Sequence, residues 1–244
     1  SFDPVITFSI NNSNKVTAVS ESLKQDTLQL FNIKKEIEVI PNFICFNEYQ
    51  LPNNEKYKKR FAPNNEFIVT HVSNFRKVKR IEDVVKIFDS LSSKISCKLI
   101  FAGDGPERYK IEHQCREKYK NDQVIFLGNL KSTIEVLNIS DLFLLPSEKE
   151  SFGLAALEAM ASGVPVISTI SGGIPEVIEH GKCGFLSKIG DTEDMSKNAL
   201  QILSSENKHN AFKKEALARA KLFDIDNVLP KYEDLYKRTI SLSQ

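Results

Sequence analysis

The sequence is short of cysteine, of net charge and of long apolar runs, and each shortage excludes a class of protein. Its four cysteines are scattered over 244 residues without a C-x-x-C pair, which argues against a zinc site and a disulfide framework. The 33 Lys and Arg residues balance 32 Asp and Glu residues, so no broad basic field would attract a nucleic-acid backbone. No run approaches the ~20 apolar residues that span a bilayer. We therefore expect reduced cysteines, no metal, no nucleic-acid partner and no integral membrane segment.

The first residues show no targeting pattern either. The segment SFDPVITFSINNSNK lacks the charged stretch followed by an apolar one that marks a signal peptide, so we expect a cytoplasmic protein. An apolar, helix-like stretch follows Pro4 at once, without an initiator Met, and we expect a piece of a longer protein. With 41% hydrophobic residues, the chain has enough apolar material for one or two cores.

From Phe67 onward, β-branched or apolar runs alternate with longer amphipathic stretches. This alternation predicts an α/β fold with a doubly wound, Rossmann-like parallel sheet covered on both faces, over residues 66–225. Strands are expected at 67–72, 98–101, 124–127, 142–145, 166–168 and 184–186, and helices at 82–91, 107–119, 132–139, 154–161, 175–179 and 192–204.

The two ends of the sequence have a different organisation. A strand is expected at 15–19, a helix from its N-cap Ser20 to about residue 31, and a second strand at 37–42. Two strand–helix elements are too few for an independent sheet, so residues 1–46 are predicted to be the last elements of a preceding domain. The polar stretch 47–65 is predicted to be the interdomain segment, and a final helix is expected at about 228–242, within a C-terminal segment 226–244.

The segment from Leu144 to Ala161 is the first candidate site. A strand is expected to end at residue 145, and a polar loop then leads to a helix that begins near Phe152. Ligands of open α/β sheets bind at this edge, where strands end and the following helices begin. The free N–H groups of Phe152, Gly153 and Leu154 can receive a phosphate, and Gly153 lets it approach the backbone.

Two carboxylates, Glu150 and Glu158, lie on either side of that helix start. Neither would attract a phosphate, so a ligand that meets both must offer them hydroxyl groups. A nucleotide-sugar, with a diphosphate between two diols, fits that requirement. Alternatively, Glu150 is only a favourable charge near a helix N-terminus and Glu158 a solvated residue, and the spacing alone leaves both interpretations open.

A cationic loop follows the first strand of the sheet. Arg76, Lys77, Lys79 and Arg80 provide four positive charges within five residues at the carboxyl end of this strand, which suits a diphosphate. The alternative is a solvated basic turn. His71, within the strand, is predicted to be a hydrogen-bonded structural residue.

Three other motifs are weaker candidates. Gly103 and Gly105 follow a strand, but Arg108 stands where a dinucleotide-binding fingerprint needs its third glycine, so this segment is predicted to be a turn. The segment 171–173, Ser-Gly-Gly, either lies close to a ligand or forms a plain left-handed turn. The D-x-D at 224–226 would suit a metal-dependent sugar transferase, but it follows the last sheet element.

Taken together, these motifs resemble the retaining glycosyltransferases of family 4, which have the two-domain GT-B fold. The resemblance rests on EKESFGLAALEAMASGVPVI, SGGIPEVI, GFL, AGDGP, FLGNL and IPNF, and it covers essentially the whole chain. HVSNFRKVKRIEDVV, LLPSEKESFGL and VTAVSESL leading to IEVIPNFI are similar to the N-acetyl-α-D-glucosaminyl L-malate synthases. That resemblance implies transfer of N-acetylglucosamine from UDP-N-acetylglucosamine to L-malate, the first step of bacillithiol synthesis.

The family resemblance also implies a role for each acidic and glycine-rich motif. Glu158 would bind the ribose hydroxyls and Glu150 the hydroxyls of the sugar. Residues 152–154 would offer backbone N–H groups to sugar or phosphate oxygens, and the backbone from Gly128 to Leu130 would lie near the uracil.

In most relatives the cationic loop carries an Arg and, five positions later, a Lys. Here these positions hold Asn74 and Lys79, so Lys79 takes the diphosphate role and Arg76 supplies the charge that Asn74 lacks. The implied reaction retains the configuration at the anomeric carbon by front-face transfer. Lys79, Arg76 and the helix N-terminus would stabilise the leaving diphosphate, with no metal and no cofactor.

The same resemblance places the acceptor pocket in the preceding domain. We therefore expect this chain alone to bind UDP weakly and to turn over little, and its final helix to pack back toward that domain. Homo-oligomerisation is left open. The rival interpretations are a family 4 glycosyltransferase with another acceptor, a UDP-N-acetylglucosamine epimerase of the same fold, or a non-catalytic nucleotide-binding or scaffold domain. Glu158→Ala should weaken nucleotide binding in either sugar-nucleotide enzyme and leave a scaffold unaffected.

Overall fold

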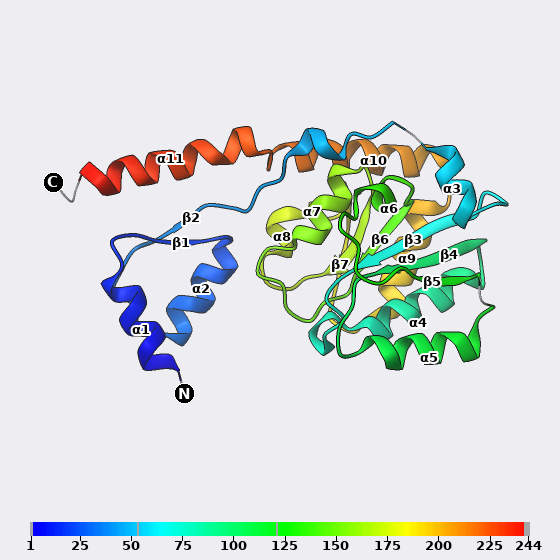
Figure 1. The fold of residues 1–244 in the computed structure, drawn as a ribbon, viewed down its shortest axis with the longest axis horizontal. Helices are drawn as coiled ribbons and strands as arrows, with labels where there is room; N and C mark the ends of the chain where they lie inside the picture. Colours follow the sequence, from blue (N-terminus) through cyan, green and yellow to red (C-terminus); the bar gives the residue numbers. More distant parts are fainter. Residues whose placement is uncertain (1, 53, 121, 242–244) are drawn as a thin grey trace.

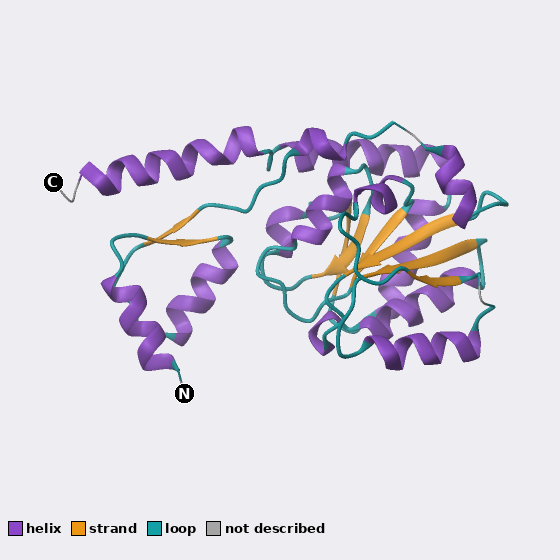
Figure 2. Ribbon diagram, viewed as in Figure 1, coloured by secondary structure: helices purple, strands orange, loops and turns teal. Residues whose placement is uncertain are grey.

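The main body of the protein is a six-stranded parallel sheet between two layers of helices (Figure 2). This computed structural model describes residues 2–52, 54–120 and 122–241. The strands of the sheet are β3 (Phe67–Val72), β4 (Cys97–Ala102), β5 (Val124–Phe126), β6 (Leu142–Leu145), β7 (Val166–Thr169) and β8 (Gly184–Ser187). All six lie where the alternating pattern predicts them, and the parallel sheet with helices on both faces is confirmed.

The strands follow one another in the order β5-β4-β3-β6-β7-β8. Strands β3, β4 and β5 therefore follow one another from the centre of the sheet to one edge, and strands β6, β7 and β8 follow one another from the centre to the other edge. Every pairing is parallel. In a sheet of this order, the crevice between the two central strands is the place where ligands bind.

Two sets of helices cover the two faces of the sheet. One face carries α4 (Ile81–Ser92), α5 (Arg108–Lys118) and α9 (Thr192–Leu203). The other carries α3 (Glu55–Phe61), α6 (Ile134–Asn138), α7 (Leu154–Ala161), α8 (Ile174–Val177) and α10 (Glu206–Lys221). Because both faces are covered, β4 is buried along its whole length, as its unbroken apolar pattern requires.

The first forty residues form a smaller unit beside the sheet (Figure 1). It holds α1 (Asp3–Asn12), β1 (Val16–Ala18), α2 (Glu21–Leu30) and β2 (Ile37–Val39). Strands β1 and β2 form a two-stranded parallel sheet of their own. The last helix, α11 (Ile225–Ser241), runs back alongside this unit, where Val228 and Leu235 bury Ile40 and Arg238 pairs with Glu38. Leu242, the expected end of this helix, lies outside the described residues.

Two helices lie where the sequence pattern predicted none. Helix α3 lies in the polar stretch 47–65, and there Lys58 forms an ion pair with the buried Asp141 at 2.8 Å. Helix α10 buries only His209, Ala216 and Ala220, and small or polar inner residues leave little hydrophobic periodicity to detect. The short 3₁₀ helices η1 (Phe46–Tyr49) and η2 (Lys77–Lys79) were also not predicted.

None of the described helices is both long enough and apolar enough to cross a membrane. All four cysteines are free, three of them buried and Cys45 exposed.

Candidate functional site

The candidate site lies in the crevice between β3 and β6. In these strands Val69 pairs with Leu142 and Thr70 pairs with Phe143, so their backbone pairing ends before their carboxyl ends. The loop after β3 and the loop after β6 meet across the gap, where Glu148 N donates a 2.8 Å hydrogen bond to Val78 O. The cationic loop and the acidic loop of the sequence thus meet at the point where the strand order reverses.

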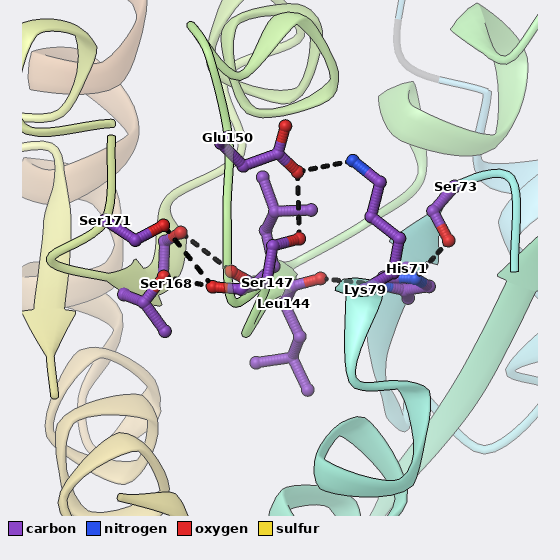
Figure 3. Close-up of polar contacts among 10 residues, drawn as sticks. His71, Ser73, Lys79, Leu144, Ser147, Glu150, Ser168 and Ser171 are labelled. Atoms are coloured by element: carbon purple, nitrogen blue, oxygen red, sulfur yellow. Dashed lines mark hydrogen bonds and ion pairs between the residues drawn. The ribbon is translucent and has the colours of Figure 1, made fainter. Parts of the chain in front are cut away.

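Lys79 and Glu150 face each other at this point (Figure 3). Lys79 Nζ lies 2.6 Å from Glu150 Oε1, and Ser147 Oγ donates a 2.8 Å hydrogen bond to the same carboxylate oxygen. The Lys79 side chain is 19% exposed and that of Glu150 12% exposed, whereas Ser147 is fully buried. A cation and a hydrogen-bond acceptor of fixed geometry are therefore presented side by side, as a ligand with phosphate and hydroxyl groups requires.

The cationic loop is held in an unusual conformation. Phe75 has a φ of 20° and Arg80 a φ of 50°, values that residues other than glycine seldom adopt. Gly103 and Gly105 lie so close behind the loop that a Cβ on Gly103 would stand 1.9 Å from Ser73 O. The segment 103–105, predicted to be only a turn, is thus a turn that also supports this loop.

His71 is a structural residue, as predicted. Its Nδ1 lies 2.8 Å from Leu144 O and its Nε2 2.7 Å from Ser73 Oγ (Figure 3). A carbonyl can only accept, so Nδ1 carries the proton and the Ser73 hydroxyl donates to Nε2. Burial lowers the pKa of His71 to about 4, which keeps the ring neutral. The side chain thereby joins β3 to β6 where their backbone pairing ends.

Helix α7 begins directly behind Glu150. Its N-cap, Gly153, has a φ of 95°, which favours glycine, and a Cβ there would stand 2.4 Å from Ile174 Cδ1, so the isoleucine side chain would have to move. No side chain caps this end of the helix, which leaves its first N–H groups available to an anion. Phe152 is buried against Phe223, whereas Leu154 is exposed.

The Ser-Gly-Gly segment 171–173 packs directly against the acidic loop. A Cβ on Gly172 would stand 1.8 Å from Glu150 O, and Gly173 N donates a 2.9 Å hydrogen bond to that same oxygen. The left-handed turn, one of the two interpretations that the sequence allowed, is confirmed by the φ of 54° at Gly172, and proximity to a ligand stays a prediction. The packing behind Glu150 was not predicted.

Glu158 does not join the Lys79–Glu150 pair. It lies on α7, and the Tyr49 hydroxyl of η1 hydrogen-bonds to its carboxylate. Burial raises the pKa of Glu158, and this hydrogen bond partly offsets the shift. Burial and the Glu158 charge raise the pKa of Tyr49, which keeps it protonated as a donor. No sequence pattern pointed to Tyr49, which lies six residues after the IPNF motif at 40–43, within the stretch 47–65 predicted to be the interdomain segment.

The other predicted site residues lie around the crevice. Asn74 and Arg76 are exposed on the cationic loop. Arg80 instead turns to the buried Asp83, 2.6 Å away. Gly128, after β5, accepts a 2.7 Å hydrogen bond from Gly103 N through its carbonyl oxygen, and Leu130 is exposed two residues later.

Within residues 2–52, 54–120 and 122–241, no three His, Cys, Asp or Glu side chains are arranged to hold an ion. In the D-x-D segment, Asp224 accepts a 3.3 Å hydrogen bond from Phe46 N. This carboxylate thereby fixes the start of η1.

The chain is similar in sequence to known glycosyltransferases. A model of the family described as glycosyl transferases group 1 matches residues 53–219. The N-acetyl-alpha-D-glucosaminyl L-malate synthase of Bacillus anthracis is 42% identical over 238 residues, which make up 97% of this chain and 62% of that enzyme.

The fold is similar to those of two solved structures. A sucrose-phosphate synthase from Thermosynechococcus elongatus has a TM-score of 0.86 at 22% identity, over 98% of this chain and 61% of the other. HepE of Anabaena, solved in complex with UDP and glucose, has a TM-score of 0.84 at 22% identity, over 96% of this chain and 66% of the other. At such identities the likeness concerns the fold alone, and that fold is the Rossmann-like half of the GT-B type.

Proposed function

The chain belongs to the group 1 glycosyl transferases, and from this premise we propose that it forms the donor-binding half of a retaining N-acetylglucosaminyltransferase. The donor is UDP-N-acetylglucosamine and the acceptor is L-malate, the substrate that gives the Bacillus anthracis relative its name. The chain spans 62% of the length of that relative.

The observation that carries the proposal is the meeting of Lys79 and Glu150 at the switch point of the sheet. Lys79 supplies positive charge for a diphosphate, and Glu150, held by Ser147, accepts hydrogen bonds from sugar hydroxyls. Both needs arise together in a nucleotide-sugar, whose diphosphate adjoins a polyhydroxylated ring.

The remaining predicted residues complete a donor site in this proposal. The N–H groups of Phe152, Gly153 and Leu154 at the start of α7 receive phosphate or sugar oxygens. Arg76, exposed on the same loop as Lys79, adds charge beside the diphosphate, and Asn74 offers an amide. Each of these groups lies on one of the loops that border the crevice.

The nucleoside end of the donor extends past α7. Glu158, oriented by Tyr49, binds the ribose hydroxyls, and the backbone from Gly128 to Leu130 lies against the uracil. The buried surroundings of Glu158 strengthen a hydrogen bond to its carboxylate. A ribose without its hydroxyls would leave that carboxylate with one donor fewer, which gives the site a means of selecting its ligand.

The reaction is a front-face transfer that retains the anomeric configuration. The acceptor hydroxyl adds to the anomeric carbon on the side from which the diphosphate departs, and the proton of that hydroxyl passes to a diphosphate oxygen. The carbon–oxygen bond to the diphosphate breaks with both electrons on UDP. Lys79, Arg76 and the α7 N-terminus stabilise this developing negative charge, so preorganised charge lowers the barrier.

We propose that the enzyme works in the cytoplasm and needs no cofactor or metal. Residues 66–225 form the donor domain, residues 1–46 the last acceptor-side elements and residues 47–65 the interdomain segment, and the C-terminal helix in 226–244 packs back toward the acceptor side. The acceptor pocket belongs to a further N-terminal part, so the 244-residue chain alone is expected to bind UDP and to turn over little or nothing.

A product analysis tests the proposal. A polypeptide that joins this chain to an acceptor half is incubated with UDP-N-acetylglucosamine and L-malate, and the products are followed by proton NMR. The expected result is malate-dependent release of UDP with an α-configured glycoside. A β-configured product, turnover of the donor without an acceptor, or transfer that ignores malate in favour of another hydroxy acid would each contradict it.

A further inference from the structure

Helix α2 begins against the loops that hold Glu150. Its N-cap, Ser20, is buried and accepts a hydrogen bond from Leu23 N at 3.0 Å, as expected for a serine at this position. The same hydroxyl donates a 2.7 Å hydrogen bond to Ser151 O, 131 residues along the chain. Helix α2 is thus attached to the residue that follows Glu150.

The remaining N–H groups at the start of α2 bind a distant carboxylate. Glu176 Oε2 accepts from Glu21 N at 2.8 Å, and Glu176 Oε1 accepts from Ser22 N at 2.9 Å. These N–H groups have no partner within the helix, and a carboxylate is the group that a helix N-terminus favours most. Glu176 therefore caps a helix that lies 155 residues before it.

The contact between α2 and the segment 171–173 is close, and it includes the backbone that supports Glu150. A Cβ on Gly173 would stand 2.9 Å from Ser20 Cβ and 2.3 Å from Ser151 O, so glycine is needed for α2 to approach. Gly173 N in turn donates to Glu150 O. At the rim, Lys149 Nζ lies 3.4 Å from Asp26 on α2. The backbone on both sides of Glu150 is thereby held between α2 and the segment 171–173.

Glu176 is itself anchored from the opposite side. Arg219 on α10 donates to Glu176 O at 2.6 Å and to Val177 O at 2.9 Å. These bonds fix the end of α8 against the body of the sheet. The carboxylate of Glu176 is consequently presented to α2 from a rigid base.

We propose that Glu176 is a positioning residue: by capping α2 it holds that helix on the acidic loop, and so fixes the place of the Glu150 carboxylate. The consequence for the sugar rests on the proposed function, in which Glu150 binds the hydroxyls of the transferred sugar. Through this cap, the order of the donor loop depends on the first forty residues of the chain. The docking itself rests only on the hydrogen bonds of Glu176, Ser20 and Gly173.

Amide hydrogen exchange on the 244-residue chain tests the docking without any nucleotide. In Glu176→Ala, the amides of residues 21–23, which bond to Glu176 and Ser20, and the amide of Gly173, which bonds to Glu150 O, are expected to exchange about tenfold faster than in the unmodified chain, the size expected for loss of a helix cap. Glu179→Gln, which removes an equal charge three residues later from a surface pair with Lys182, is the matched control. Unchanged protection in Glu176→Ala would overturn the docking.

Two further variants keep the test decisive. If Glu176→Ala does not fold, Glu176→Gln keeps the shape and removes the charge and one acceptor, and the same loss is expected in smaller degree. Ser20→Ala breaks the contact from the α2 side and is expected to speed exchange of the Gly173 amide in the same way. Loss of protection confined to 21–23 would contradict the positioning role, because Glu176 would then be a cap and nothing more.

Calorimetry then connects the docking to the donor. Glu176→Ala is expected to lose the extra affinity that UDP-N-acetylglucosamine has over UDP, and to bind UDP itself as the unmodified chain does. An equal loss for both ligands would overturn the positioning role in favour of general destabilisation. If neither ligand bound, even with an acceptor half joined to the chain, the proposed function would fail while the exchange data would still decide the docking.

Discussion

The ammonium group of Lys79 lies 2.6 Å from Oε1 of Glu150, across the gap that opens where β3 and β6 stop pairing. The two residues are 71 positions apart in the chain and come from the loops after the two central strands. Their meeting at the switch point gives the candidate site its chemistry, and most of the predictions below follow from it.

Lys79→Ala is expected to weaken binding of UDP about 10- to 100-fold, which corresponds to the loss of one charge-assisted hydrogen bond to a phosphate. Binding of uridine, which has no phosphate, should remain as it was. Lys77→Ala removes an exposed charge from the same 3₁₀ helix and is the matched control. Isothermal titration of the three proteins with both ligands measures the effect, and an equal loss for uridine and UDP would count against a diphosphate role.

Ser147→Ala removes the buried hydroxyl that donates to Glu150. Because a hydrogen bond to a charged group contributes about 1.5–3 kcal/mol, affinity for UDP-N-acetylglucosamine should fall about tenfold. Affinity for UDP should stay close to that of the unmodified chain. Ser168→Ala deletes another buried hydroxyl, one that bonds to Leu145 O, and it serves to separate this effect from a general loss of stability.

Gly172→Ala and Gly181→Ala form a second matched pair. Both glycines have a positive φ, +54° and +80°, but a Cβ on Gly172 would stand 1.8 Å from Glu150 O, whereas a Cβ on Gly181 would meet nothing within 4 Å. We expect Gly181→Ala to lower the free energy of unfolding by about 1 kcal/mol and Gly172→Ala by about 1–3 kcal/mol more. Urea denaturation measures both free energies of unfolding. Equal losses would show that the acidic loop moves away from the added Cβ without a further loss of stability.

Acid is expected to destabilise the protein through His71. Burial lowers its pKa from 6.5 to about 4, so between these values the unfolded chain binds a proton that the folded chain does not. The stability provided by the neutral ring is present above pH 6.5 and is lost as the pH falls toward 4, by on the order of 3 kcal/mol.

Urea denaturation at several pH values between 7.5 and 4.5 checks this effect. His71→Asn offers an N–H in place of Nδ1 but does not titrate, so its stability should fall less steeply with acid. His209, whose pKa burial also lowers, contributes equally to both proteins and cancels in the comparison. Parallel curves for the two proteins would contradict the assignment to His71.

Much of the sheet could be predicted from sequence because its strands are short apolar runs between turn signals. Strand β3 begins and ends where the pattern places it, and the approach of Lys79 to Glu150 follows from parallel strands ending at one edge. Helix α10 could not be found in the same way, since its buried residues are His209 and two alanines. Helix α3 consists mostly of charged residues, so it shows no apolar periodicity that would predict a helix.

The contacts that support the site were the least predictable. Ser20 meets Ser151 and Glu176 meets α2 over more than 130 residues of sequence, and no spacing rule connects them. Gly172 and Gly173 were a usable signal, because glycine often stands where two backbones approach closely, and Gly172 also has a positive φ.

The most direct test of a uridine nucleotide site is a calorimetric titration of the chain with UDP and with ADP, alongside Glu158→Gln. The account predicts that UDP binds, that ADP binds at least about tenfold more weakly, and that the variant loses a similar factor for UDP, the cost of one hydrogen bond to a buried carboxylate. Equal binding of the two nucleotides would contradict the uracil assignment. Unchanged UDP binding by the variant, or no binding even when an acceptor half is joined to the chain, would contradict the donor site itself.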